Sequence, residues 1–67
     1  MQRRVVYKND GTIIGMYYLE TKLDLNGLNE LIIDDEELKN ITSQAGPYQN
    51  IKVINGLVTI VEEYIGG

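Results

Sequence analysis

A chain of 67 residues, 43% apolar and 24% charged, has the length and composition of a single small folded domain spanning residues 1–67. It contains no cysteine and no histidine, which excludes disulfides, thiolate metal sites and a histidine general base. The net charge is −4, and residues 1–22 are net basic whereas the remainder is strongly acidic, so a broad nucleic-acid-binding surface is not expected.

A β-hairpin is predicted near the start of the chain. β-branched and aromatic residues flank an Asn-Asp-Gly turn at residues 9–11, where the glycine supplies the positive φ of the turn. A two-residue loop would pair Tyr7 with Ile14. A three-residue loop with a glycine bulge would pair Tyr7 with Ile13, and the sequence leaves both registers open. Two arginines at the beginning of the first strand are expected at a solvated strand end.

A turn at Asn26-Gly27 and a short buried strand at residues 31–33 are predicted in the middle of the chain. Four consecutive acids then follow, namely Asp34, Asp35, Glu36 and Glu37. They can be interpreted as metal ligands, as paired catalytic acids or as the beginning of a helix.

The helix is the best of these interpretations, and its predicted extent is about residues 35–45. Asp34 suits the N-cap, Glu37 the third position of a capping box, and Ile33 and Leu38 the two positions of a hydrophobic staple. The helix dipole favours acidic side chains in the first turn. Further along, Leu38, Ile41 and Ala45 form one apolar stripe, and Gly46-Pro47 marks the end.

The second hairpin is predicted around the type I′ turn Asn55-Gly56. Counting outwards from this turn pairs Val53 with Val58 and Ile51 with Ile60, and these four side chains are expected on the core face.

The predicted fold class is therefore α+β, with two β-hairpins and a short strand forming a small sheet and one helix packed on one face. The opposite face is expected to carry apolar and aromatic side chains. We therefore predict an interface there, formed by Met16, Tyr17, Tyr18 and Tyr64. A second predicted surface is the acidic face of residues 34–37.

No residue set indicates catalysis, a metal or a cofactor. Consecutive acids at a helix start point in different directions and cannot converge on one ion, and the single serine has no activating base. We therefore expect a non-enzymatic cytoplasmic protein, without membrane or nucleic-acid partners, whose partner is a second copy of itself or another protein.

The segment Val58 to Gly67, which ends in Gly66-Gly67, resembles the end of ubiquitin-like sulfur-carrier proteins. The resemblance implies a β-grasp carrier whose terminal glycine carboxylate is adenylated, although that family places its main helix earlier in the chain. A flexible terminus of small residues is the alternative.

The strand and turn patterns of residues 5–15, 31–38 and 52–58 together resemble small proteins of bacteriophages and prophages. This resemblance implies no known activity, only a non-enzymatic accessory or assembly role, in the host cytoplasm if the protein is viral. Because so small a chain without cysteine needs another source of stability, we expect it to be a homo-oligomer. Three functions are thus expected in order: a binding or assembly protein, a ubiquitin-like carrier, and an acidic inhibitor of a host protein.

Overall fold

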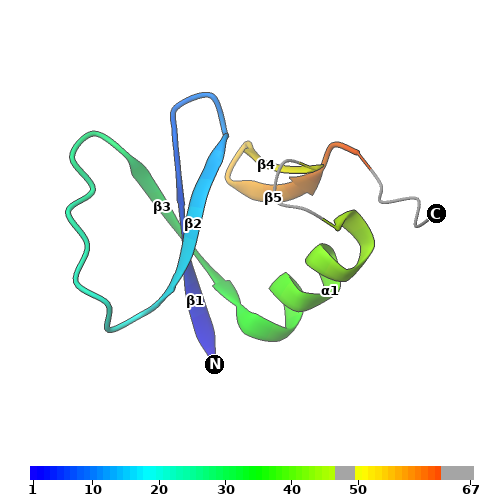
Figure 1. Cartoon of the computed structure of the whole chain (residues 1–67), viewed down its shortest axis with the longest axis horizontal. Coiled ribbons are helices and arrows are strands. Elements are labelled where there is room, and N and C mark those ends of the chain that lie inside the picture. Colours follow the sequence, from blue (N-terminus) through cyan, green and yellow to red (C-terminus); the bar gives the residue numbers. More distant parts are fainter. Residues whose placement is uncertain (47–49, 63–67) are drawn as a thin grey trace.

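The computed structural model describes residues 1–46 and 50–62 and shows a small α+β fold. The elements follow the order β1 (Gln2–Tyr7), β2 (Ile13–Tyr18), β3 (Asn29–Asp34), α1 (Asp35–Ala45), β4 (Ile51–Ile54) and β5 (Leu57–Ile60). The strands form two sheets rather than one, a three-stranded antiparallel sheet in the order β2-β1-β3 and a hairpin β4-β5. The helix follows β3 directly and contacts both β3 and β5 (Figure 1).

The first hairpin closes with the three-residue loop, so Tyr7 pairs with Ile13. Gly11 has a φ of 90°, as the glycine bulge of this loop requires. A further irregularity follows at once, because Val6 pairs with Gly15 and leaves Ile14 as an extra residue in β2. Beyond this bulge, the hairpin has the pairing that the two-residue loop would have produced.

The predicted short strand is longer than expected and pairs along its whole length with β1. Its three predicted residues do not share one environment: Ile33 is buried, whereas Ile32 is 50% exposed, because successive strand residues alternate between faces. The turn before β3 is confirmed, since Asn26 and Gly27 both have positive φ and Leu28 N–H donates to the Leu25 carbonyl at 2.7 Å.

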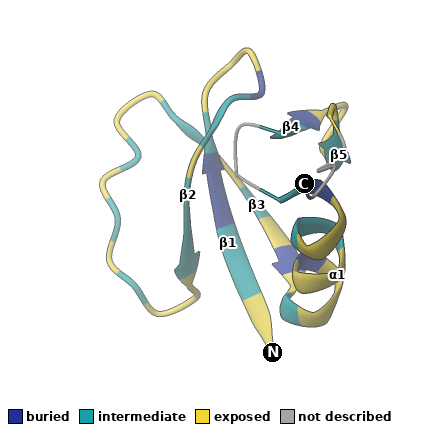
Figure 2. Cartoon of the chain, turned by 45° about the vertical axis from the view of Figure 1, so that its right-hand side comes forward, coloured by how far each residue is buried: buried dark blue, intermediate teal, exposed yellow. Residues whose placement is uncertain are grey.

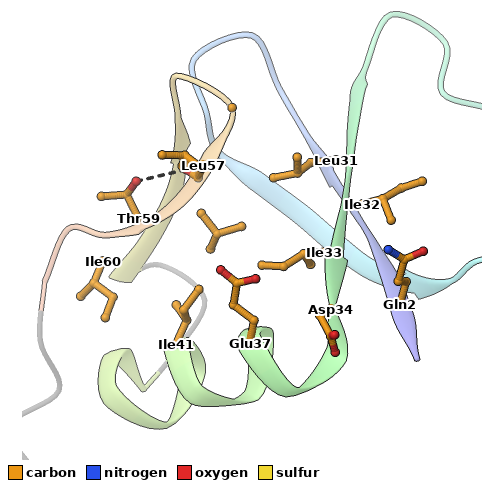
Figure 3. A pocket seen from close by; sticks show the side chains of 12 residues that line it. Gln2, Leu31, Ile32, Ile33, Asp34, Glu37, Ile41, Leu57, Thr59 and Ile60 are labelled. Atoms are coloured by element: carbon orange, nitrogen blue, oxygen red, sulfur yellow. Dashed lines mark hydrogen bonds between the residues drawn. The ribbon is translucent and has the colours of Figure 1, made fainter.

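The helix prediction and its N-cap are confirmed. The Asp34 carboxylate accepts a hydrogen bond of 3.1 Å from Glu36 N–H, and both predicted staple residues, Ile33 and Leu38, belong to the buried core. The prediction of a capping box through Glu37 is wrong, because the Glu37 side chain points away from the cap and into the groove described below (Figure 3). At the other end, Gly46 has a φ of 77°, and its N–H donates to the Thr42 carbonyl at 2.9 Å. Pro47 lies outside the described residues.

The second hairpin has the predicted register, with Val53 opposite Val58 and Ile51 opposite Ile60. Asn55 and Gly56 have φ of 53° and 77°, as a type I′ turn requires. Ile51 and Val53 are buried, and Val58 packs against the core.

One core joins the two sheets and the helix. Its buried cluster consists of Val5 of β1, Ile33 of β3, Leu38 of α1 and Val53 of β4. Figure 2 shows buried segments on each of these four elements. The sheets also meet through the backbone, where Thr12 forms an antiparallel bridge with Lys52. The two sheets and α1 thus enclose a common interior.

The face of the three-stranded sheet that points away from this core is less open than expected. Met16 was predicted there, but it lies opposite Val5 on the core face and packs against the buried cluster. Val6, which does point outwards, is only 4% exposed. On the same face, the Tyr17 ring lies so close over Gly15 that a Cβ there would stand 2.9 Å from it. The Tyr17 side chain therefore covers Gly15, and Val6, the partner of Gly15 in β1, is hardly exposed.

Candidate binding groove

A groove of about 710 Å³ lies between β3, α1 and β5 (Figure 3). Its apolar lining includes Leu31 and Ile33 of β3, Ile41 of α1, and Val58 and Ile60 of β5. The volume is within the range of binding pockets, and the mixture of an apolar floor with a few polar groups is typical of them.

The β3 side of the groove is a free strand edge. Within residues 1–46 and 50–62, β1 pairs with β3 on one side and no strand pairs with it on the other. Asp35 N–H donates to the Met1 carbonyl, so the odd-numbered residues along β3 direct their backbone groups towards β1. By alternation, the N–H and C=O of Glu30 and Ile32 point to the free edge. Such an edge is a template for a further strand.

Among the described residues, the β5 side is a second free edge. Val61 N–H donates to the Asn50 carbonyl, so odd-numbered residues of β5 direct their backbone groups towards β4. The backbone groups of Val58 and Ile60 therefore point away from β4. Because each successive neighbour in the series β3, β1, β2, β4, β5 is antiparallel to the one before, β3 and β5 run in the same sense.

The polar groups of the groove give it a negative end. Asp34 and Glu37 line it, and no lysine or arginine does so among the described residues. The Glu37 carboxylate points into the groove, between the side chains of Ile33 and Ile41 in the view of Figure 3. Both acids lie at the junction of β3 and α1, so the charge is concentrated at the end of β3.

The predicted acidic face is not one uniform surface. Asp35 lies between two cations, with Arg3 Nη1 at 3.4 Å and Lys39 Nζ at 3.3 Å from its carboxylate oxygens. Asp34 caps the helix through one oxygen. Glu36 is exposed on the helix, and Glu37 enters the groove. The four residues therefore have four different environments.

The two N-terminal arginines were expected at a solvated strand end, and this is wrong for both, because their side chains are mostly buried and paired. Arg4 Nε donates to Glu30 Oε2 at 3.0 Å, and its Nη1 donates to the Thr21 carbonyl at 2.6 Å. Arg3 pairs with Asp35. Neither is a free basic group for an external ligand.

The residues predicted as an interface do not all lie on one face. Tyr18 is 53% exposed, with the Arg3 guanidinium 4.5 Å from the centre of its ring, and it shares the core-side face with Met16. Tyr17 lies on the opposite face. Tyr64 lies outside the described residues, as do Gly66 and Gly67 of the predicted carrier terminus.

Within residues 1–46 and 50–62, no group of three or more His, Cys, Asp or Glu side chains is placed to hold a metal ion. None of the helices in these residues has the length and apolar character needed to cross a membrane.

The groove itself was not predicted from the sequence. Its parts, β3, α1 and β5, are not all adjacent in the chain. The groove forms because β3 pairs with β1 on one side, which leaves the other edge of β3 and an edge of β5 to line it. Leu57, which is 68% exposed in the structure, lies in the lining of the groove. Comparison with protein-family models, with curated proteins and with solved structures found no match to this chain.

Proposed function

We propose that this chain is a small non-enzymatic binding protein that holds another polypeptide in the groove between β3, α1 and β5. The observation that supports the proposal most directly is the coincidence of an apolar floor with two free strand edges. Such edges offer backbone hydrogen bonds, and the floor offers apolar contact, which are the two contributions that strand addition uses.

Exposed apolar side chains extend the groove on both sides. Ile32 is 50% exposed on β3, and Leu57 is 68% exposed where β5 begins. A domain this small buries few side chains, and exposed apolar groups beside a groove mark a contact surface rather than a stabilising feature of the isolated fold. An accessory or assembly role, as the resemblance to small phage proteins implies, would use the same surface.

Self-association is the second form of this proposal, and the tip of the second hairpin favours it. Ile54 and Leu57 lie opposite each other there, and both side chains are exposed. Two copies that bury these side chains would form a homo-oligomer of mass above 7.6 kDa. Sedimentation at rising protein concentration measures this directly, and a single species of monomer mass at all concentrations contradicts this second form.

The experiment for the proposal itself is selection of binders from a displayed library of random peptides. Binders are then mapped by NMR on the full chain, and Leu57→Lys is compared with Leu19→Lys, which changes an exposed leucine outside the groove. The proposal predicts that binders shift groove resonances and lose affinity only for Leu57→Lys. Selection that enriches no peptide, or only peptides that map elsewhere, contradicts it.

A further inference from the structure

We infer that the β3 edge accepts an extended segment of a partner protein that begins with two adjacent basic residues and continues with apolar residues facing the groove. The inference rests on the proposed function and specifies the chemistry of the partner. It follows from three features: the direction of the free backbone groups, the place of the acids, and the unsuitability of a second β3 as the occupant.

The added strand is expected to run antiparallel to β3. The backbone groups of Ile32 point to the free edge, and antiparallel pairing is the more stable arrangement per residue. Because β5 runs in the same sense as β3, this direction is also antiparallel to β5. The partner's amino end then lies beside Asp34, at the end of β3.

The acids at that end define the first two residues of the partner. Asp34 lies on the outer face of β3, whereas Glu37 points into the groove (Figure 3). Neighbouring residues of a strand point to opposite faces. Two adjacent basic residues therefore reach the two acids simultaneously, one on each face.

Apolar residues are expected after the basic pair. Side chains of the added strand that point inwards would lie over Leu31, Ile33 and Val58. On the outer face, the residue opposite Ile32 meets a side chain that is 50% exposed. Burial of these surfaces supplies the non-directional part of the affinity.

A second copy of β3 is a poor occupant of this edge. Antiparallel pairing of two copies about Ile32 would place Glu30 of each opposite Asp34 of the other on the same face. Like charges directly opposite one another destabilise a strand pair. Arg4 is already paired with Glu30 within each copy, so a second β3 brings no spare cation to Asp34 or Glu37, and the acids favour a basic partner over self-pairing.

The test is NMR titration of the full chain with a short capped peptide that begins with two arginines and continues with alternating valine and threonine. A matched peptide with two glutamates in place of the arginines is the control. We expect the arginine peptide to shift the amides of Glu30, Ile32 and Asp34, and to bind about tenfold more tightly than the glutamate peptide. Its affinity should fall as salt is raised.

Two pairs of variants separate backbone pairing from charge. Ile32→Pro removes the N–H that points to the free edge and should abolish binding, whereas Ile32→Thr removes the same side chain, keeps the N–H and should retain binding. Glu37→Lys should weaken binding of the arginine peptide about tenfold, whereas Glu36→Lys, the neighbouring exposed acid outside the groove, should leave it unchanged.

The outcomes separate the inference from the function on which it rests. Peptide binding in the groove whose affinity is unchanged by both Ile32→Pro and Glu37→Lys overturns the inference and leaves the proposed function intact. Chemical-shift changes of groove amides that increase with protein concentration in the absence of peptide assign the site to a second copy, and they also overturn the inference. Failure of this peptide together with failure of the library selection overturns both.

Discussion

The Val53 N–H donates a hydrogen bond of 2.9 Å to the Gly11 carbonyl, which fastens the turn of the first hairpin to β4. Gly11 is buried and has a φ of 90°, and a Cβ at this position would collide with the Val53 carbonyl oxygen. This hydrogen bond belongs to the Thr12–Lys52 bridge, which connects the two sheets through their backbones. β5 pairs with β4 and forms one side of the groove.

Gly11→Ala should therefore destabilise the fold more than Gly56→Ala. Both substitutions introduce a side chain at positive φ, which costs about 1–2 kcal/mol. Only Gly11 has the collision with Val53, since nothing lies within 4 Å of a Cβ at Gly56. Loss of the Val53 hydrogen bond should add about 1 kcal/mol or more. Equal unfolding free energies for the two variants in urea denaturation would show that the contact contributes nothing.

Asp34→Ala should destabilise the protein by about 1 kcal/mol, because the helix loses the acceptor for Glu36 N–H. Glu36→Ala is the matched control, since it removes a neighbouring exposed acid without removing the cap. Thermal unfolding followed by circular dichroism measures both. A control variant that is as unstable as Asp34→Ala would mean that the first-turn charge, and not the cap, is the important feature.

Arg4→Met should loosen the connection between β2 and β3. The Arg4 guanidinium binds the Glu30 carboxylate and the Thr21 carbonyl, so it joins this long connection to the sheet. We expect faster amide exchange in residues 19–28 and a loss of about 1 kcal/mol in stability. Lys22→Met, an exposed residue of the same connection, should change neither quantity. Unchanged exchange in Arg4→Met contradicts the assigned role.

Asp10 should contribute to the acid sensitivity of the first hairpin. The hydrogen bond from Thr12 N–H, 2.9 Å from the Asp10 carboxylate, lowers the pKa of this group below its ordinary value of 3.8. A lowered pKa stabilises the fold above the unfolded-state value, and this contribution is lost as the pH falls through the folded-state value. Asp10→Asn should therefore lower the free energy of unfolding above about pH 4, and the difference from the wild-type chain should shrink as the pH falls below that value. A difference that stays constant from neutral to acid pH would contradict this.

The local elements could be predicted because their signals are local. The α1 boundaries follow from a cap, an apolar stripe and a glycine within about a dozen residues, and the second hairpin follows from one Asn-Gly turn. The face of Met16 could not be predicted. The three-residue loop, continued without a bulge, would place Met16 opposite Arg4 on the outer face, whereas the extra residue Ile14 places it opposite Val5.

The candidate site could not be predicted because it depends on contacts between distant parts of the chain. The run of acids correctly indicated a helix start, but the separate environment of Glu37 depends on β5 lying across the groove from it. The division into two sheets depends on β3 pairing with β1 rather than with β5. Neither the pairing of β3 with β1 nor the position of β5 across the groove has a signature in turn residues or in hydrophobic periodicity.

The most direct measurement of the central claim is the exchange rate of the Ile32 amide in the full chain with and without the arginine peptide. The Ile32 N–H points to the free edge, whereas the Leu31 N–H points towards β1. At saturating peptide, we predict at least about tenfold slower exchange at Ile32 and little change at Leu31. Exchange at Ile32 that stays unchanged while the peptide is bound would contradict the claim that β3 accepts a partner strand.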